Sequence, residues 1–333
     1  MIDLRLGDCK EVLKSIPDSS VDLILTDPPY YKVKGEAWDR QWDTPKGFLD
    51  WLDSVLVELS RVLKSNGSLY LFASPQMSAR VEVLIGGHFN VLNNIRWVKE
   101  AGWHNKTEKE ALRSFLSPYE SVIFAEHYGS DSYAKGEAGY SAKVDKLRGF
   151  IFEPILNYID GERKRAGVSK EDVNEALGFR RLGGMAGRHY FSSSQWCLPT
   201  EEHYNKMRIA LSRLNHGGEY LKKDYEELKK DYEELRRPFS VSADVPHTDT
   251  WTFKTVPYYK GKHPCEKPLE MLEHIINSSS KDGAVVLDCF AGTGNTGKAA
   301  KKLNRNFIGI EKDPAYFQIV KRRIEEAQLE LSC

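Results

Sequence analysis

This sequence lacks the features that are typical of secreted proteins, of membrane proteins and of proteins stabilised by a structural metal ion. It has five cysteines in 333 residues, and none forms a Cys-x-x-Cys pair, which argues against a structural zinc site and a disulfide framework. No apolar run approaches the roughly 20 residues needed to span a bilayer, and no charged-then-apolar leader opens the chain. These absences predict a cytoplasmic protein with reduced thiols.

Net charge is missing as well. Lys and Arg total 48 and Asp and Glu total 48, so the formal net charge is zero. Any contact with nucleic acid must then come from a local basic patch, because the chain as a whole carries no positive field. The length allows one large domain with an insertion, or two domains.

Short apolar runs near both ends of the chain predict buried strands, and helical patterns separate several of them. One such pattern is Phe48–Leu63, where apolar residues recur at helical spacing. Strands that alternate with helices predict an α/β fold with a doubly wound, mostly parallel sheet. We expect seven strands: Ile2–Leu6, Val21–Thr26, Ser68–Ala73, Val91–Val98, Glu120–Ala125, Ala284–Cys289 and Asn306–Ile310.

The middle of the chain differs from its ends, because it contains no convincing strand pattern. Helices are expected instead at Pro154–Arg165, at Lys170–Leu177 behind an N-cap at Ser169, and from about 199 to 214. The predicted organisation is an α/β domain made of 1–128 and 245–333, interrupted by a mostly helical insertion at 129–244.

A perfect internal repeat lies in this insertion, where residues 221–227 and 228–234 both read LKKDYEE. The repeat predicts a short heptad helix over 220–237 with an apolar seam. That seam could make a coiled-coil contact within the chain or between two copies, which keeps a homodimer open. The alternative is an exposed helix kept soluble by its Lys and Glu pairs. The seam residues are Leu221, Tyr225, Leu228, Tyr232 and Leu235.

The first motif with chemical meaning is Asp27-Pro28-Pro29-Tyr30, directly after an expected strand. The two prolines end that strand, which puts Asp27 and Tyr30 at its carboxyl end, where open α/β sheets bind ligands. The exocyclic amine of a base is a poor nucleophile, because its lone pair is delocalised into the ring. The Asp27 carboxylate and the Pro28 carbonyl could each accept one N–H and free that lone pair, while Tyr30 offers a flat face for an extruded base. The plain alternative is a strand-ending turn with an acidic cap.

The second motif, DCFAGTGNTG, runs from Asp288 to Gly297 and fits the G-x-G-x-x-G pattern. Such a loop lets a ligand approach the backbone closely and aims a helix N-terminus at an anionic group of that ligand. Here we expect that group to be the carboxylate of a methionine moiety in the ligand. Glu311 closes the following strand, in place to bond ribose hydroxyls. Dinucleotide enzymes share this loop, so an NAD-dependent oxidoreductase is a competing hypothesis. Only a short helix follows Glu311, however, which leaves no half-fold for a second nucleotide.

Together the two motifs resemble the beta group of DNA amino-methyltransferases, which modify adenine N6 or cytosine N4 with S-adenosylmethionine. The shared order is Asp-Pro-Pro-Tyr, then a target-recognition insertion, then the glycine loop. Further matches are Leu6-Gly7-Asp8-Cys9 and the segment His263–Pro268. The resemblance covers roughly 1–128 and 245–333, and Gly167–Leu214 is similar to the recognition region of phage-borne members.

The resemblance implies a class I, Rossmann-like methyltransferase fold that acts on double-stranded DNA after flipping a base. In this family the strands before Asp8 and Asp27 lie beside the two C-terminal strands. The Asp8 position contacts the cofactor adenine, and the Lys267 segment lines the methionine end. The implied catalytic residues are Asp27, Pro28, Pro29 and Tyr30. The implied cofactor-binding residues are Asp8, Cys9, Asp27, His263, Lys267, Asp288, Phe290, Ala291, Gly292, Gly294, Asn295, Thr296 and Glu311.

The target base and the partners are less firmly implied. Asp rather than Ser at the first motif position favours adenine over cytosine N4, and RNA as substrate or an inactive DNA-binding relic stay open. We expect no metal cofactor, because the sulfonium of S-adenosylmethionine already activates the methyl group for transfer. A restriction endonuclease partner is left open. The predicted DNA-contact patch lies in a stretch without Asp or Glu, 178–198, although a solvated basic loop would look the same. It comprises Arg180, Arg181, Arg188 and His189.

Overall fold

The chain forms two compact units in the computed structural model. One unit lies within residues 1–127 and 238–333, and the other lies within 128–237. The structure describes residues 1–99, 112–127, 152–193, 195–241, 247–257, 259 and 264–327. Each unit has a hydrophobic core of its own.

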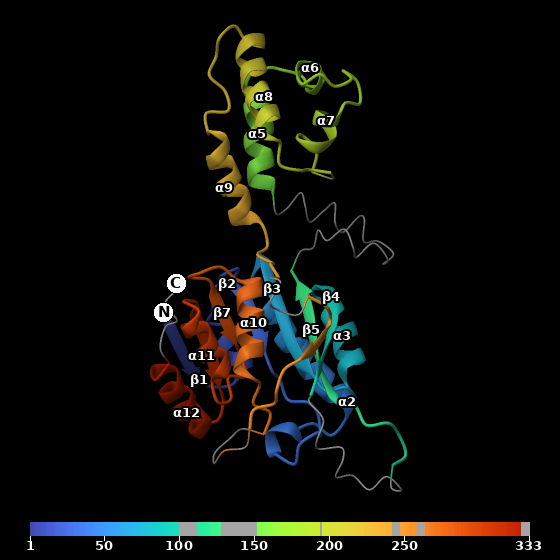
Figure 1. The fold of residues 1–333 in the computed structure, drawn as a ribbon, viewed down its shortest axis with the longest axis vertical. Coiled ribbons are helices and arrows are strands. Elements are labelled where there is room, and N and C mark those ends of the chain that lie inside the picture. Colours follow the sequence, from blue (N-terminus) through green and yellow to red (C-terminus); the bar gives the residue numbers. More distant parts are fainter. Residues whose placement is uncertain are drawn as a thin grey trace. The chain divides into compact units, whose positions relative to one another are not determined.

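The first unit is built on one sheet, which has eight strands in the described part of the chain (Figure 1). The strand order is β1-β8-β7-β2-β3-β5-β4-β6, and all neighbours are parallel except that β5 runs against both β3 and β4. The bounds are β1 (Ile2–Leu6), β2 (Val21–Thr26), β3 (Leu63–Ala73), β4 (Asn90–Val98), β5 (Tyr119–Glu126), β6 (Thr250–Thr252), β7 (Val285–Asp288) and β8 (Asn306–Glu311).

This arrangement confirms the expected mostly parallel α/β fold and all seven expected strands. The additional strand, β6, pairs with β4. Because β6 has only three residues, it is too short to produce a periodic signal in the sequence. The two ends of the chain meet as expected: β1 pairs with β8, and β2 pairs with β7. The carboxyl ends of these four strands therefore lie side by side at one edge of the sheet.

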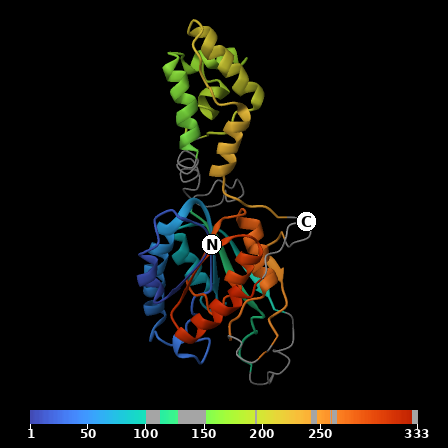
Figure 2. The ribbon, with the colours of Figure 1, turned by 90° about the vertical axis from the view of Figure 1, so that its left-hand side faces the viewer.

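Helices cover both faces of the sheet, as Figure 2 shows with the early helices on one side and the late helices on the other. One layer consists of α1 (Cys9–Leu13), α2 (Pro45–Val62) and α3 (Ser78–Gly86). The other consists of α10 (Leu269–Ser279), α11 (Asn295–Lys302) and α12 (Pro314–Glu325). The sheet is thus doubly wound, with a separate apolar cluster on each face.

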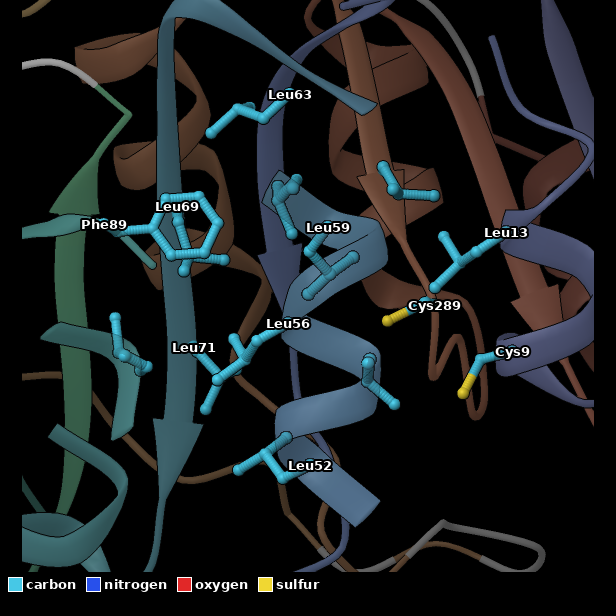
Figure 3. Packing of buried hydrophobic residues seen from close by; sticks show 14 of the residues in the cluster. Cys9, Leu13, Leu52, Leu56, Leu59, Leu63, Leu69, Leu71, Phe89 and Cys289 are labelled. Atoms are coloured by element: carbon cyan, nitrogen blue, oxygen red, sulfur yellow. The ribbon is translucent and has the colours of Figure 1, made fainter. Parts of the chain in front are cut away.

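Helix α2 shows how the sequence builds one of these layers (Figure 3). It begins earlier than its apolar pattern predicts, because the Thr44 side chain accepts from the backbone N–H of Gly47 and Pro45 suits the first turn. Leu52, Leu56 and Leu59 are fully buried on the face that meets the sheet. Burial of each such side chain contributes about 1.5–3 kcal/mol. The packing fixes β2 and β3, and β2 leads into the Asp-Pro-Pro-Tyr motif.

The second unit is helical in its described residues, as expected for the insertion. Its elements are α5 (Glu153–Arg165), α6 (Lys170–Ala176), α7 (Met185–His189), α8 (Glu201–Leu214) and α9 (Tyr225–Leu235). The predicted N-cap is confirmed: Ser169 and Asp172 form a reciprocal capping box on α6. Gly178, with φ of 82°, ends that helix in the left-handed conformation.

The LKKDYEE repeat is helical only in part, so the expected helix over 220–237 was too long. Asp224 caps α9 by accepting from the backbone N–H of Glu227, and residues 221–223 before it are not helical, with φ of 50° at Leu221. Leu228 is fully buried and the ring of Tyr232 stacks on Phe152 at 4.9 Å. The heptad seam thus packs within the chain, against the core of its own unit.

Candidate active site

Four acidic residues mark the carboxyl edge of the sheet. Asp8 follows β1 and Asp27 follows β2, while Asp288 ends β7 and Glu311 ends β8. Because these strands are parallel neighbours, their ends converge, and the four side chains line one cavity of about 470 Å³. A cavity of this size at this edge is typical of small-ligand sites in open α/β sheets.

Most of the expected cofactor-binding residues line this cavity. Gly294 does not: it has φ of 83° and turns the loop into α11. His263 lies outside the described residues. The expected residues in the lining are Asp8, Cys9, Asp27, Lys267, Asp288, Phe290, Ala291, Gly292, Asn295, Thr296 and Glu311.

Two tryptophans that sequence reasoning missed also line the cavity. Trp51 projects from α2, and its ring lies 5.7 Å from the ring of Phe290 in the glycine loop. Trp38 lies in a short 3-10 turn, η1 (Ala37–Asp39), which follows the Asp-Pro-Pro-Tyr motif. In the sequence Trp51 reads as one more apolar position of a helix, so no local signal separates it from the core.

The glycines of the loop have different tasks. Gly292 adopts φ of 53°, and its N–H donates to Glu311 Oε2 at 2.8 Å, which ties the loop to the end of β8. Gly297 lies against α12 and β8, where a Cβ atom would stand 2.3 Å from Ile324 and 2.6 Å from Phe307. The loop therefore depends on glycine for backbone conformation at one end and for close packing at the other.

The pKa values of the carboxyl groups that line the cavity are shifted in different directions. Burial raises the pKa of Glu311. Burial also raises the pKa of Asp288 to about 6, although it accepts hydrogen bonds from Thr26 Oγ1 at 2.9 Å and from the backbone N–H of Phe290 at 3.1 Å. In Asp8, burial is outweighed by the Lys312 ammonium, 2.9 Å away, which lowers the pKa of that carboxyl.

Asp27 presents its two oxygens to different surroundings. Oδ2 accepts from Lys267 Nζ at 2.5 Å, whereas Oδ1 is buried and accepts no hydrogen bond from the described residues. Burial raises the pKa of Asp27, and the Lys267 charge and the nearby Tyr30 hydroxyl, which donates its hydrogen to Glu120, act against that rise. A buried acceptor without a donor costs free energy unless a ligand supplies one. The unpaired Oδ1 atom is therefore the main sign of a ligand with an N–H or O–H group.

Tyr30 is held by Asp39, a residue that sequence reasoning missed. The backbone N–H of Tyr30 donates to Asp39 Oδ1 at 2.6 Å, and that of Lys34 donates to Oδ2 at 2.5 Å. The two residues after Tyr30, Tyr31 and Lys32, adopt φ near 60°, a strained conformation for side-chain-bearing residues. The fully buried Asp39 carboxylate offsets this strain and fixes the motif. Nothing in the local sequence distinguishes it from other loop carboxylates.

A second carboxylate near the motif, Glu120 on β5, was also missed as a functional residue. Its Oε2 atom accepts from the Tyr30 hydroxyl at 2.8 Å and lies 3.3 Å from Lys267 Nζ, while Oε1 accepts from Lys99 Nζ. Burial acts to raise the pKa of Glu120, but Lys267 and Lys99 outweigh it and hold the pKa at about 2. The only sequence signal was a charged residue at the start of a largely apolar run.

The expected DNA-contact residues lie in the second unit, with Arg180 and Arg181 between α6 and α7 and with Arg188 and His189 in α7. Arg180 and Arg188 are exposed, and His189 Nδ1 lies 2.9 Å from the carbonyl of Gln195. The premise that nothing acidic balances this group was wrong for Arg181. Its guanidinium pairs with Asp172 at 2.9 Å and Glu175 at 3.1 Å, both contributed by the preceding helix.

The described residues contain neither a metal-binding cluster nor a membrane-spanning helix. No group of three or more His, Cys, Asp or Glu side chains there is arranged to hold a metal ion. No helix in the same residues has the length and apolar character needed to cross a membrane.

Comparison with known proteins places this geometry among DNA-modifying enzymes. A family model described as DNA methylase matches residues 21–322. The type II methyltransferase M.HinfI of Haemophilus influenzae is 26% identical over 96% of this chain and 67% of its own length. The DNA adenine methyltransferase YhdJ of Escherichia coli K12 is 27% identical over 96% of this chain and 82% of its own length.

A solved structure shows the same fold. It is TTHA0409 of Thermus thermophilus, complexed with S-adenosyl-L-methionine. The TM-score is 0.51 at 21% identity, with 98% of this chain and 95% of the other covered. This chain therefore shares its fold with a solved structure.

Proposed function

This chain belongs to the DNA methylase family of N6 and N4 amino-methyltransferases, and we propose that it transfers a methyl group from S-adenosylmethionine to the N6 amino group of adenine in DNA. The observation that carries the proposal is the buried, unpaired Oδ1 atom of Asp27 at the cavity. An amino group would supply the donor that this acceptor lacks. Family membership leaves no place for the NAD-dependent alternative.

The cavity fits S-adenosylmethionine by charge and by shape. The bound cofactor supplies a methyl group activated as a sulfonium, and a cation suits a cavity lined by Asp27 and Asp288. The Glu311 carboxylate, fixed by the N–H of Gly292, is suited to the ribose hydroxyls. Asp8 is suited to the adenine amine, and the aromatic rings of Trp51 and Phe290 add a flat apolar wall. TTHA0409, with the same fold, was solved with this cofactor.

In the proposed reaction the chain prepares the amine and does not supply a nucleophile. Asp27 Oδ1 and the Pro28 carbonyl each accept one N–H, which frees the nitrogen lone pair. The flipped base stacks on the ring of Tyr30, which is buried in this structure and therefore has to become accessible when DNA binds. The nitrogen forms its bond to the methyl carbon as the carbon–sulfur bond breaks, and that electron pair stays on sulfur. The methylated nitrogen is cationic and acidic, so its proton leaves afterwards to water.

Adenine is favoured over cytosine by two observations. The motif begins with Asp27 rather than Ser, and a relative that matches 96% of this chain, YhdJ, carries the name DNA adenine methyltransferase. The N4 position of cytosine is the second candidate, because the family covers both amines.

The test is tritium transfer from labelled cofactor to unmethylated genomic DNA, followed by digestion and nucleoside analysis. We expect the label in N6-methyladenine. Label in N4-methylcytosine would establish the second candidate, and absence of label in DNA would reject the proposed function. The same assay with excess EDTA tests the expected metal independence, since loss of activity on chelation would contradict it.

The second unit is proposed to contact the DNA, with Arg180, Arg188 and His189 as the candidate residues. Arg181 is a weaker candidate than the sequence indicated, because two carboxylates already neutralise its charge. A homodimer and an endonuclease partner stay predictions without support here, and the heptad seam is already used within the chain.

A further inference from the structure

The cavity is joined to a buried charge network, and the methyl-transfer scheme uses only one of its charged groups, Asp27. Lys267, with a side chain 6% exposed, lies between two carboxylates: Asp27 at 2.5 Å and Glu120 at 3.3 Å. Lys99 pairs with the far oxygen of Glu120. Two cations and two anions balance, so the network is neutral as a whole.

Glu120 joins the two parts of the Asp-Pro-Pro-Tyr motif. Through Oε2 it accepts from the hydroxyl of Tyr30, and the same oxygen faces the ammonium that holds Asp27. The Lys267 ammonium also lies 5.0 Å from the centre of the Tyr30 ring. One side chain on β5 therefore contacts both the expected stacking ring and the partner of the amine-orienting carboxylate.

The sheet itself gives no reason for a charge at this position. Three residues in the middle of β5, Val122, Ile123 and Phe124, are apolar and buried. A carboxylate that is 12% exposed costs free energy to desolvate, and an apolar residue of similar size is often as stable in such a place. The cost of burying this carboxylate is explained if its hydrogen bonds are needed to orient its two partners, Tyr30 and Lys267.

We propose that Glu120 is a positioning residue for methyl transfer, which locks the Tyr30 ring and the Lys267–Asp27 pair into one rigid group. The proposal rests on the proposed function. By holding the Tyr30 hydroxyl, Glu120 fixes the plane on which the flipped base stacks. By sharing Lys267, it keeps that ammonium on Asp27 Oδ2, so that Oδ1 stays available for the amine.

The experiment compares Glu120→Gln with Glu126→Gln in the full chain. Glu126 is a matched control, because it is a buried carboxylate on the same strand that bonds Asn90 and lies six residues from Glu120. Tritium transfer to unmethylated genomic DNA gives kcat and KM for DNA. Calorimetry gives the affinity for S-adenosylhomocysteine, and thermal unfolding shows whether each variant is folded.

We expect Glu120→Gln to lower kcat/KM for DNA by about tenfold to a hundredfold, as misplacement of reacting groups does, with unchanged S-adenosylhomocysteine affinity. Glu126→Gln should keep the activity of the unmodified chain. Tyr30→Phe removes only the hydroxyl, so its effect should overlap with that of Glu120→Gln, and the double variant should lose less than the product of the two single losses.

Four outcomes separate the hypotheses. Absence of transfer by the unmodified chain rejects the proposed function itself. An active unmodified chain with equal activity in both Gln variants overturns the positioning role. Losses that multiply in Tyr30→Phe/Glu120→Gln overturn it as well, because they mean that Glu120 does not act through Tyr30. If Glu120→Gln does not fold, retention of full activity by Tyr30→Phe alone contradicts the proposal.

Discussion

At the scale of single residues, the site depends on how one side chain divides its atoms between partners. Asp27 offers Oδ2 to Lys267 and keeps Oδ1 buried and unpaired. An ionised carboxylate can do both because each oxygen is an acceptor, whereas an amide has only one acceptor oxygen. This difference makes the proposed role of Asp27 testable without a change of shape.

We predict that Asp27→Asn lowers turnover by about a hundredfold or more, a loss common for a removed positioned group. Lys267 would claim the single amide oxygen, and the NH₂ group would then face the amine donor to donor. Tritium transfer measures the loss, and calorimetry with S-adenosylhomocysteine should show nearly unchanged affinity. The control is Asp22→Asn on the same strand, where Asp22 bonds Lys64 and Val285 away from the cavity. Full activity of Asp27→Asn would refute the mechanism.

Asp288 makes a prediction about pH and stability. Burial raises the pKa of this carboxyl to about 6 from an ordinary value of 3.8, so between these values the folded chain binds a proton that the unfolded chain has released. Stability therefore falls as pH rises through this window and stays reduced above it. Asp288→Asn removes this pH dependence.

The urea midpoints of Asp288→Asn and the unmodified chain should diverge between pH 5 and pH 7.5, with the variant gaining about 1 kcal/mol. Other groups titrate in both proteins and cancel in the comparison. A constant difference between the two proteins across this range would show that Asp288 is not the group responsible.

At the scale of secondary-structure elements, the glycine loop works because a strand, a turn and a helix pack closely. Asn295, at the start of α11, donates to Glu266 and to the carbonyl of Lys267, both at 2.9 Å. Arg323 from α12 reaches Glu266 at 3.0 Å. These contacts hold the segment that carries Lys267 against the loop, so the packing of α11 affects the position of Lys267.

We predict that Gly297→Ala destabilises the chain by about 1–3 kcal/mol, because its Cβ atom would meet Ile324 and Phe307 at less than contact distance. Gly161, inside α5, has open space around its Cβ position and serves as the control. Gly161→Ala should stabilise its helix by about 0.5–1 kcal/mol. Opposite shifts of the two variants in thermal unfolding would support this packing, and equal shifts would contradict it.

At the scale of the whole molecule, the chain separates chemistry from the candidate DNA contacts. The cavity lies in the unit made from both chain ends, and the arginine group lies in the inserted unit. Each unit has its own core, so substitutions on the surface of one should leave the other intact. DNA affinity and cofactor affinity should therefore change independently.

We predict that the double variant Arg180→Ala/Arg188→Ala weakens DNA binding and flattens its salt dependence by about 0.9 in slope for each phosphate that is no longer neutralised. Arg181→Ala should have a smaller effect, because Arg181 is paired with Asp172 and Glu175. DNA titrations across a salt series measure both slopes, with S-adenosylhomocysteine affinity as the control. Equal slopes for the double variant and the unmodified chain would mean that the arginines are solvated surface.

The sequence by itself determined what depends on neighbouring residues. Apolar periodicity located the seven strands, and the N-cap residue Ser169 indicated where α6 begins. The strand and cap signals are local, because capping, strand-ending prolines and positive-φ glycines act within a few residues. That both chain ends build one sheet was implied by the resemblance to the amino-methyltransferases, which the order of Asp27, the insertion and the glycine loop carries.

Only the tertiary structure decided which distant groups share an atom. Lys267 lies 240 residues from Asp27 in the sequence, and Glu120 lies 90 residues from Tyr30, yet these four side chains form one buried network. Similarly, Arg181 lies in a stretch without acids, but packing brings carboxylates of α6 to it. The sequence states the charge and polarity of each side chain, but its partners and its burial depend on how the whole chain packs. Partners and burial then decide whether a side chain neutralises a neighbouring charge, positions a neighbouring group or stays available to bind a ligand.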